Sequence, residues 1–360
     1  MKILIYISYL GLGGAERVMS IISNHLVERG HDVHIIASAY TNVDYYINPK
    51  INIHIIPRPV PGESVPDDYE KYRTEIRKEV IDINPDVMIG NVHLGYYNLW
   101  LATKGLGIPI VASDHNNFRM KYSSLRIYDI RYYFYDYADV TTVLTQNDFN
   151  YMKDYLHNMK VIHNPLSFPI LEEDVQKEKT ILCCGRLDVW EIKGMDLMIK
   201  IWSMIANKYP DWKLQIAGGG KEENLEYLTG LVKTEGVEDS VEFLGFRTDI
   251  QNIMQKTSIF ALSSREEGFP CVLTEAMSQG CAPVSFEIYG NIKEIITDGY
   301  DGYLIPDGNI EMFAQRLEEL INNEETRKKF RENARISLRR FEPEKIVDQW
   351  EEMLLNLVKK

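Results

Sequence analysis

Residues 1–37 read MKILIYISYLGLGGAERVMSIISNHLVERGHDVHIIA, and the rest of the chain repeats their pattern. An unbroken apolar run at residues 3–7 leads into a glycine-rich turn. Apolar residues from Val18 to Leu26 then recur at helical spacing, and a second apolar run follows at residues 33–37. Unbroken apolar runs joined by an amphipathic helix are typical of parallel strands that helices cover on both faces. This stretch therefore predicts a strand–helix–strand unit of a parallel sheet.

The same alternation continues along the chain and then starts again. In the first half, further strand-like runs lie at residues 53–56, 86–89, 110–112 and 140–144. After a segment rich in proline and glutamate, a second series lies at residues 180–184, 213–217, 241–244, 259–262 and 282–286. We therefore predict an α/β protein with two Rossmann-like, doubly wound parallel-sheet domains, residues 1–166 and 167–340. Such sheets bind ligands at the carboxyl ends of their strands, so we expect the site in a central cleft that both domains face.

The charge of the chain is unevenly distributed. The net charge is −13; residues 1–166 carry 16 basic and 18 acidic side chains, whereas residues 167–360 carry 24 and 35. An acidic second half repels a polyanion, so we expect no nucleic-acid partner. A phosphate-bearing small ligand stays compatible with this charge, because a local site can oppose the overall sign.

The cysteines and the apolar runs limit the class of protein further. Cys183, Cys184, Cys271 and Cys281 form no C-x-x-C pair and no metal-ligand spacing with histidine, so we expect buried thiols. The chain contains no apolar run long enough to cross a bilayer, and its N-terminal run is too short for a signal peptide. These features predict a cytoplasmic protein.

The strongest chemical signal is the stretch SSREEGFPCVLTEA at residues 263–276. We expect a strand to end there, a polar loop to carry Glu267, and a helix to begin near Pro270 with Glu275 in its second turn. Free amides at such a helix start suit a phosphate, and two carboxylates can bracket a polyhydroxyl ligand. The alternative is a helix whose acidic N-terminus is favoured by the helix dipole alone.

A second signal follows the strand expected at residues 180–184. Gly185 and Arg186 come directly after it, and Lys193 and Gly194 follow a few residues later. Arginine offers a planar fork of donors and lysine a point charge, and together these match a diphosphate. The alternative is a pair of ordinary surface cations.

The glycine turn after the first strand reads GLGGAE at residues 11–16. It departs from the dinucleotide fingerprint G-x-G-x-x-G because Glu16 takes the third glycine position. The end of the second strand, IASAY at residues 36–40, also lacks the acidic residue that would bind a ribose. A Rossmann dehydrogenase that binds NAD is therefore disfavoured, whereas a turn that admits a diphosphate still fits.

Together these motifs resemble the family-4 retaining glycosyltransferases, which have the GT-B fold. That family has a glycine loop after its first strand, an arginine and lysine pair in its second domain, and an E-x7-E motif that Glu267 and Glu275 match. The stretches LGFRTDI at 244–250 and EIITDGYDGYLIP at 294–306 extend the resemblance. One departure is YGNIK at 289–293, where the family usually has a glycine-rich turn.

The resemblance implies a role for each matching residue. Arg186 and Lys193 would bind the donor diphosphate and stabilise the charge of the leaving group, and Glu267 would face the transferred sugar. His115 would lie near the donor sugar; the alternative is a hydrogen-bonded loop histidine. The implied donor-binding residues are Gly13 and Gly14 for the phosphates, Gly245, Phe246 and Arg247 for the base, Glu275 for the ribose, and Gly268, Phe269, Pro270, Cys271 and Val272.

Three further expectations come from the resemblance. The family needs no metal ion or other cofactor, and this chain contains no D-x-D triplet. In the family the C-terminal helix returns to the first domain, so residues 341–360 are expected there. The first domain would then lie on the acceptor side, and the second would bind the nucleotide sugar.

Residues 118–137 combine basic and aromatic side chains. Four basic residues stand there beside two aspartates, and the sequence places Arg119, Lys121, Arg126 and Arg131 among several tyrosines. This mixture suits a membrane interface, so one hypothesis is peripheral contact with the inner face of an anionic bilayer. The alternative is a helix whose aromatic rings pack inward while its charges are solvated.

We therefore predict a retaining, metal-independent glycosyltransferase. It would transfer a hexose or N-acetylhexosamine from a nucleotide diphosphate sugar, with UDP expected from family prevalence, to a glycan or lipid-linked acceptor. The expected pathway is surface polysaccharide biosynthesis. Two alternatives stay open: a GT-B nucleotide-sugar epimerase, and a non-catalytic nucleotide- or glycan-binding module.

Overall fold

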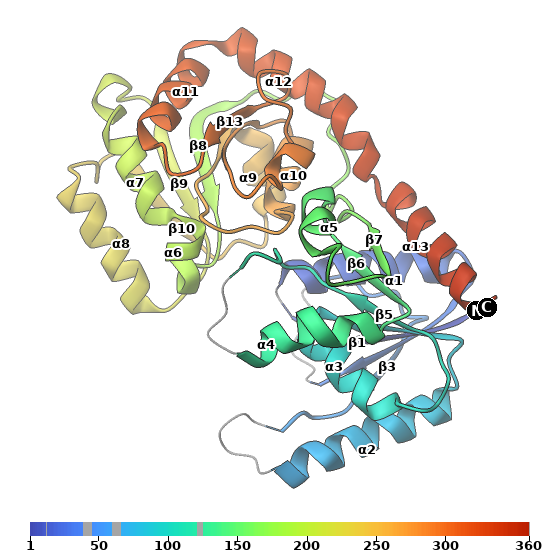
Figure 1. Cartoon of the computed structure of the whole chain (residues 1–360). Helices are drawn as coiled ribbons and strands as arrows, with labels where there is room; N and C mark the ends of the chain where they lie inside the picture. Colours follow the sequence, from blue (N-terminus) through green and yellow to red (C-terminus); the bar gives the residue numbers. More distant parts are fainter. Residues whose placement is uncertain (12, 39–44, 60–65, 121–124, 360) are drawn as a thin grey trace. The chain divides into compact units, whose positions relative to one another are not determined.

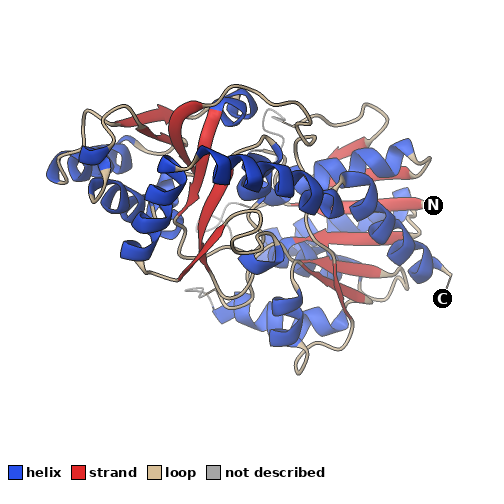
Figure 2. Cartoon of the chain, turned by 90° about the horizontal axis from the view of Figure 1, so that it is seen from above, coloured by secondary structure: helices blue, strands red, loops and turns tan. Residues whose placement is uncertain are grey.

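The computed structural model of the chain describes residues 1–11, 13–38, 45–59, 66–120 and 125–359 (Figure 1). It divides into two compact units, one made of Met1–Ser167 and Phe341–Lys360 and the other of Phe168–Arg340. In Figure 2 the strands of each unit are flanked by helices, as a doubly wound sheet requires.

Among the described residues, the first unit holds seven parallel strands in the order β3-β2-β1-β4-β5-β6-β7. They are β1 (Lys2–Ile7), β2 (Asp32–Ala37), β3 (Asn52–Ile55), β4 (Val87–Asn91), β5 (Ile110–Ser113), β6 (Val140–Val143) and β7 (Met159–Val161). The order reverses between β1 and β4, which is where open α/β sheets bind ligands. The central strands are buried almost throughout, as their unbroken apolar runs predict.

Helices connect these strands. They are α1 (Gly14–Glu28), α2 (Pro66–Ile83), α3 (Val92–Thr103), α4 (Leu125–Asp129), α5 (Gln146–Met152) and, from the end of the chain, α13 (Pro343–Val358). Between α4 and β6 the chain forms a π-helical turn, η1 (Ile130–Phe134), and a 3₁₀ turn, η2 (Tyr135–Tyr137). The core beneath α2 and α3 is rich in aromatic side chains, including Tyr6, Tyr72 and Tyr96.

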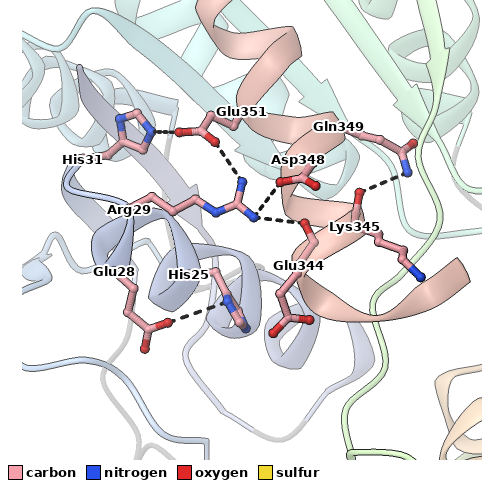
Figure 3. A network of polar contacts seen from close by, with 9 residues as sticks. All are labelled: His25, Glu28, Arg29, His31, Glu344, Lys345, Asp348, Gln349 and Glu351. Atoms are coloured by element: carbon pink, nitrogen blue, oxygen red, sulfur yellow. Dashed lines mark hydrogen bonds and ion pairs between the residues drawn. The ribbon is translucent and has the colours of Figure 1, made fainter. Parts of the chain in front are cut away.

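Polar contacts join α13 to the end of α1 and the start of β2 (Figure 3). The guanidinium of Arg29 donates to Glu351 at 2.8 Å and to the backbone carbonyl of Glu344 at 3.0 Å, and it lies 2.7 Å from Asp348. The other carboxylate oxygen of Glu351 lies 2.6 Å from Nε2 of His31. The C-terminal helix is therefore part of the first unit.

The second unit repeats the same topology. Among the described residues, its six parallel strands follow the order β10-β9-β8-β11-β12-β13. They are β8 (Glu178–Cys184), β9 (Lys213–Ala217), β10 (Val241–Gly245), β11 (Thr257–Leu262), β12 (Ala282–Glu287) and β13 (Tyr303–Pro306). The prediction of two Rossmann-like parallel-sheet domains is confirmed. The last strand, β13, was not predicted.

The helices of the second unit are mostly amphipathic and pack on this sheet. They are α6 (Trp190–Lys193), α7 (Met195–Ser203), α8 (Glu222–Thr234), α9 (Ile250–Lys256), α10 (Cys271–Ser278), α11 (Ile310–Asn322) and α12 (Glu324–Ser337). The 3₁₀ turns are η3 (Leu187–Val189), η4 (Ala206–Lys208), η5 (Ile292–Glu294) and η6 (Leu338–Phe341). The site residues expected in this unit lie at the end of β10, in the segments that follow β8, β10 and β11, and in α10.

Candidate functional site

The two strongest motifs of the second unit meet at the carboxyl edge of its sheet. The strands β8 and β11 that precede them are neighbours. The Nζ atom of Lys193, the last residue of α6, lies 2.7 Å from Oε1 of Glu267. The same oxygen accepts a hydrogen bond from Oγ of Ser264 at 2.8 Å. The carboxylate, whose side chain is 9% exposed, is therefore held in place by a cation and a hydroxyl.

A close approach of two backbones brings Lys193 to this position. Gly194 has a φ of +62°, and a Cβ atom there would lie 1.8 Å from the carbonyl oxygen of Ser263. The hydroxyl of Ser263 donates to the carbonyl of Gly194 at 2.8 Å. Only glycine fits a backbone that is both left-handed and in direct contact with its neighbour.

Arg186 follows β8 directly and is exposed. It has no ion-pair partner within the part of the chain that the structure describes, so its guanidinium is available to an anion. The loop that carries it packs against the end of β9, where a Cβ on Gly218 would lie 1.8 Å from the carbonyl oxygen of Gly185. Sequence reasoning missed this contact, although the run of three glycines at 218–220 directly after a strand was its signal.

The loop after Glu267 is fixed by a residue that the motifs did not single out. Asn291 is fully buried, and its amide donates to the backbone carbonyl of Gly268 at 3.0 Å and to that of Glu267 at 3.4 Å. Asn291 belongs to the stretch that departs from the family pattern. That departure, a buried amide in place of a glycine-rich turn, was the signal that could have identified it.

The start of α10 has the predicted arrangement. Pro270 precedes the helix, and its side chain makes no capping hydrogen bond. Phe269 is buried, whereas Cys271 and Val272 are half-buried in the first turn. Glu275 lies within the helix and is 5% exposed. The first amides of α10 therefore follow the loop that holds Glu267.

The turn expected beside the nucleotide base follows β10. Gly245 has a φ of +64°, and the ring of Phe246 is 54% exposed. The guanidinium of Arg247 is bound to both carboxylate oxygens of Asp249, at 2.7 Å each. Arg247 is therefore engaged within its own loop, and the exposed Phe246 ring is the group of this turn that offers a face for stacking.

In the first unit, the expected residues follow β1 and β5. Gly13 is the N-cap of α1, in an extended conformation and without a side-chain cap, and Gly14 is the first helical residue. Leu12 lies outside the described residues. His115 is half-buried after β5, and its Nε2 atom lies 3.1 Å from Oγ of Ser113. Both β1 and β5 end at the carboxyl edge of the same sheet.

The environment of His115 favours its neutral form. Burial lowers the pKa of His115 to about 4, against the opposing effects of the Asp114 charge and a hydrogen bond with Asn164. Burial alone would raise the pKa of the Asp114 carboxyl, but the adjacent Arg131 guanidinium holds this pKa below its usual value. At neutral pH the loop therefore presents an uncharged imidazole beside a buried carboxylate.

The expectation for residues 118–137 needs one correction. Arg131 is 1% exposed and forms an ion pair with Asp114 at 2.9 Å, so the prediction that it lends basic charge to a surface is wrong. Arg119 lies over the ring of Tyr151. Lys121 and the side chain of Arg126 lie outside the described residues. The described surface here combines two exposed rings, Tyr133 at 68% and Tyr137 at 65%, with exposed charges of both signs, Arg119, Asp129 and Asp136.

Buried thiols were predicted for the four cysteines, and three of the four are buried. Cys183, Cys184 and Cys281 are buried free thiols, whereas Cys271 is only half-buried. Across the described ranges, no group of three or more His, Cys, Asp or Glu side chains is arranged to hold a metal ion. In the same ranges, no helix combines the length and the apolar character that a membrane span needs.

Two protein-family models match the chain, one in each half. The model described as glycosyl transferases group 1 matches residues 171–337, and that described as glycosyltransferase family 4 matches residues 12–167. An uncharacterized glycosyltransferase of Haemophilus influenzae is 31% identical, covering 98% of this chain and 99% of its own length.

Two further proteins extend this similarity. A Campylobacter jejuni α-1,4-N-acetyl-D-galactosaminyltransferase, named for a GalNAc-containing diNAcBac-PP-undecaprenol, is 28% identical over 97% of both chains. The structure of Anabaena HepE in complex with UDP-glucose is 20% identical and superposes with a TM-score of 0.84 over 99% of this chain and 100% of that one. Both family models and the full-length relative identify the same family, and the fold is consistent with it. The chain belongs to the glycosyltransferases of the group 1, family-4 type, and its two Rossmann-like units are those of the GT-B fold.

Proposed function

We propose that this glycosyltransferase transfers a hexose or N-acetylhexosamine from a UDP-sugar to a glycan or lipid-linked glycan, with retention at the anomeric carbon and without a metal ion. The second unit is the donor-binding domain in this proposal, and the first unit, with residues 341–360, lies on the acceptor side. The observation that carries the proposal is the ion pair of Lys193 with Glu267, together with the exposed Arg186 at the end of the same strand β8, for which the described residues provide no ion-pair partner.

This arrangement suits a negatively charged leaving group. Arg186 and Lys193 follow one strand, and their positive charges would stabilise the diphosphate as the anomeric C–O bond breaks. The acceptor hydroxyl then forms the new C–O bond from the same face of the sugar, and its proton passes to the departing phosphate oxygen. Glu267 would bind the transferred sugar, since a carboxylate accepts hydrogen bonds from hydroxyl groups.

The relatives support the choice of acceptor. The Campylobacter jejuni relative is named for a polyprenyl-diphosphate-linked glycan, and the HepE structure holds UDP-glucose. An acceptor linked to a lipid diphosphate and a UDP-sugar donor are therefore the first substrates to test. We assign the reaction to surface polysaccharide biosynthesis, which is supported by the name of a 27% identical amylovoran biosynthesis glycosyltransferase of Erwinia amylovora.

The test is product analysis with and without EDTA. The protein is incubated with UDP-glucose, UDP-GlcNAc or UDP-GalNAc and a polyprenyl-diphosphate-linked glycan, and the new anomeric proton is examined by NMR. We expect an α-linked product and turnover that EDTA does not change. A β-linked product contradicts retention, loss of turnover in EDTA contradicts metal independence, and conversion of the donor alone into its epimer favours the epimerase.

We also propose that the first unit contacts an anionic membrane through the exposed rings of Tyr133 and Tyr137. Tyr137 stacks on Trp100, with 5.3 Å between ring centroids, and the ammonium of Lys104 lies 5.5 Å from the centroid of the Trp100 ring. Aromatic rings with a polar edge next to a cation suit the headgroup region of a bilayer. We expect flotation with phosphatidylglycerol vesicles at low salt. Absence of flotation at every salt concentration contradicts this contact.

A further inference from the structure

A buried arginine lies beneath the loop that carries His115. This loop follows β5 and continues to Phe118, and Arg131 reaches it from the π-helical turn η1. The Nε atom of Arg131 donates to Asp114 at 2.9 Å. Its two terminal nitrogens donate, at 3.1 Å each, to the backbone carbonyls of Asn117 and Asn116. One guanidinium therefore binds three of the residues that surround His115.

The partners of this guanidinium are themselves fixed. Asp114 and Arg131 are each 1% exposed. The hydroxyl of Tyr135 donates to the carboxylate oxygen of Asp114 that Arg131 also binds, at 2.9 Å. The other oxygen accepts from the backbone amide of Asn116 at 2.9 Å. The centroid of the Phe118 ring lies 4.0 Å from the guanidinium carbon of Arg131.

The far end of the loop has a second anchor. The backbone amide of Phe118 donates to the carboxylate of Asp148 at 3.2 Å, and the hydroxyl of Thr145 donates to the same carboxylate at 2.8 Å. Asp148 is fully buried, and burial raises its pKa to about 6. The loop is thus held by Arg131 on both sides of His115 and by Asp148 at Phe118.

Such an arrangement determines geometry more than it adds stability. Two buried charges lose hydration when the chain folds, and their attraction offsets this cost only when their remaining hydrogen bonds are satisfied. Here those bonds go to the backbone of the loop, so the ion pair is satisfied only in one loop conformation. The π-helical turn that provides Arg131 is itself an uncommon conformation, which occurs often near functional sites.

We propose that Arg131 is a positioning residue for the transfer reaction, which fixes the His115 loop through Asp114, Asn116 and Asn117. The inference rests on the proposed function and on the role near the donor sugar that the family resemblance implies for His115. Arg131 is too buried to meet a substrate, so it acts through the orientation of the imidazole. Lysine at this position keeps the charge but cannot bind three acceptors in one plane.

The inference predicts that Arg131 and His115 act as one unit. We expect Arg131→Lys to lower kcat by about 10²-fold, the size of effect that a misplaced catalytic group produces, with little change in the KM for the donor. In a His115→Ala background, Arg131→Lys should lower kcat no further. The matched control is Lys153→Gln, which removes an exposed cation of the same unit and should leave kcat unchanged.

Two results overturn this inference, and a third concerns the proposed function. Unchanged kcat in a folded Arg131→Lys protein contradicts the inference, as does an equal loss in the wild-type and His115→Ala backgrounds, because a purely structural arginine acts independently of His115. Unchanged kcat in His115→Ala alone instead rejects the proposed role of His115 and, with it, the basis of the inference. If Arg131→Lys does not fold, Tyr135→Phe replaces it in the test, because this substitution removes one hydrogen bond to Asp114. The decrease in kcat that Tyr135→Phe causes in the wild-type background must then be absent in the His115→Ala background.

Discussion

The Nζ atom of Lys193 and the Oε1 atom of Glu267 lie 2.7 Å apart, although 74 positions separate these residues in the chain. Each comes from a motif that on its own has an ordinary explanation, a surface lysine or an acidic loop before a helix. Their pairing at the carboxyl edge of one sheet places a cation and a carboxylate where a diphosphate and a sugar would meet. Without ligand the two charges offset each other, so in the proposed function a bound diphosphate would compete with Glu267 for Lys193.

This competition predicts opposite effects of Glu267→Gln on binding and on catalysis. The substitution removes the negative charge and releases the Lys193 ammonium, so we expect the affinity for UDP to stay or to rise. Loss of a preorganised contact to the transferred sugar should lower kcat by about 10²-fold or more. Calorimetric titration with UDP and initial-rate measurements check both effects.

The neighbouring Glu266 provides the matched control for this prediction. Glu266→Gln changes the same charge one position earlier and should leave kcat near that of the wild-type protein. A Glu267→Gln protein with full turnover contradicts the assignment. A Glu267→Gln protein that loses affinity for UDP together with kcat also contradicts the assignment.

The contact of Gly194 with Ser263 predicts a large difference between two glycine substitutions. Gly236 also has a positive φ, +67°, but a Cβ there meets nothing within 4 Å. Gly236→Ala should therefore cost only the left-handed strain, about 1–2 kcal/mol of unfolding free energy. Gly194→Ala should cost about 1–3 kcal/mol more, because its Cβ collides with the Ser263 carbonyl.

Urea unfolding and kcat together test this pair. Gly194→Ala should also lower kcat, since the backbone shift displaces Lys193 from Glu267, whereas Gly236→Ala should not. Equal losses of stability in the two variants mean that the close approach to Ser263 is unimportant.

The contacts of Glu351 predict a pH-dependent contribution to stability. Burial alone would raise the pKa of this carboxyl, but hydrogen bonds with His31 and Arg29 hold it below its usual value. Because the pKa of Glu351 is lower in the folded than in the unfolded chain, its ionised form stabilises the fold. This stabilisation is complete above the pKa of the unfolded state, about 4.3, and is lost as the pH falls through the pKa of the folded state. Glu351→Gln should therefore lower the unfolding free energy by up to about 1 kcal/mol at neutral pH, with a smaller difference in acid.

The matched control is Glu352→Gln, since Glu352 is 72% exposed and lies 3.9 Å from Lys160. Urea unfolding followed by tryptophan fluorescence can report on α13, because Trp350 is buried within it. A Glu351→Gln effect that is the same above and below pH 4 contradicts the linkage.

The sheets were predictable from the sequence because their strands are buried on both faces. Unbroken apolar runs such as residues 3–7 and 259–262 leave few alternatives to a buried parallel strand. The strand at 303–306 was missed because it is short and follows a run of polar turn residues. Helix α10 was predictable from Pro270 and the glutamates around it.

The contacts within the site were not predictable, because they depend on tertiary packing. Nothing local to Arg131 indicates that it is buried; its partner is 17 positions away, and the π-helical turn has no sequence signal. Asn291 could be recognised only as a departure from a family pattern. Arg247 was expected beside the nucleotide base. Its guanidinium instead donates hydrogen bonds to the carboxylate of Asp249, two residues later in the chain, and the sequence motif alone did not indicate this pairing.

If Arg186 and Lys193 hold the diphosphate of a nucleotide donor without a metal ion, binding must be visible in a thermal-shift experiment with UDP, GDP, ADP, CMP and NAD in EDTA. A ligand at 100 times its Kd adds about 2.7 kcal/mol to native stability. We expect one nucleoside diphosphate to raise the melting temperature equally with and without EDTA. Arg186→Ala and Lys193→Ala should each reduce this shift strongly. The control Lys200→Gln changes an exposed lysine and should leave the shift unchanged. A shift with NAD alone, or a UDP shift that survives both Arg186→Ala and Lys193→Ala, would contradict the claim.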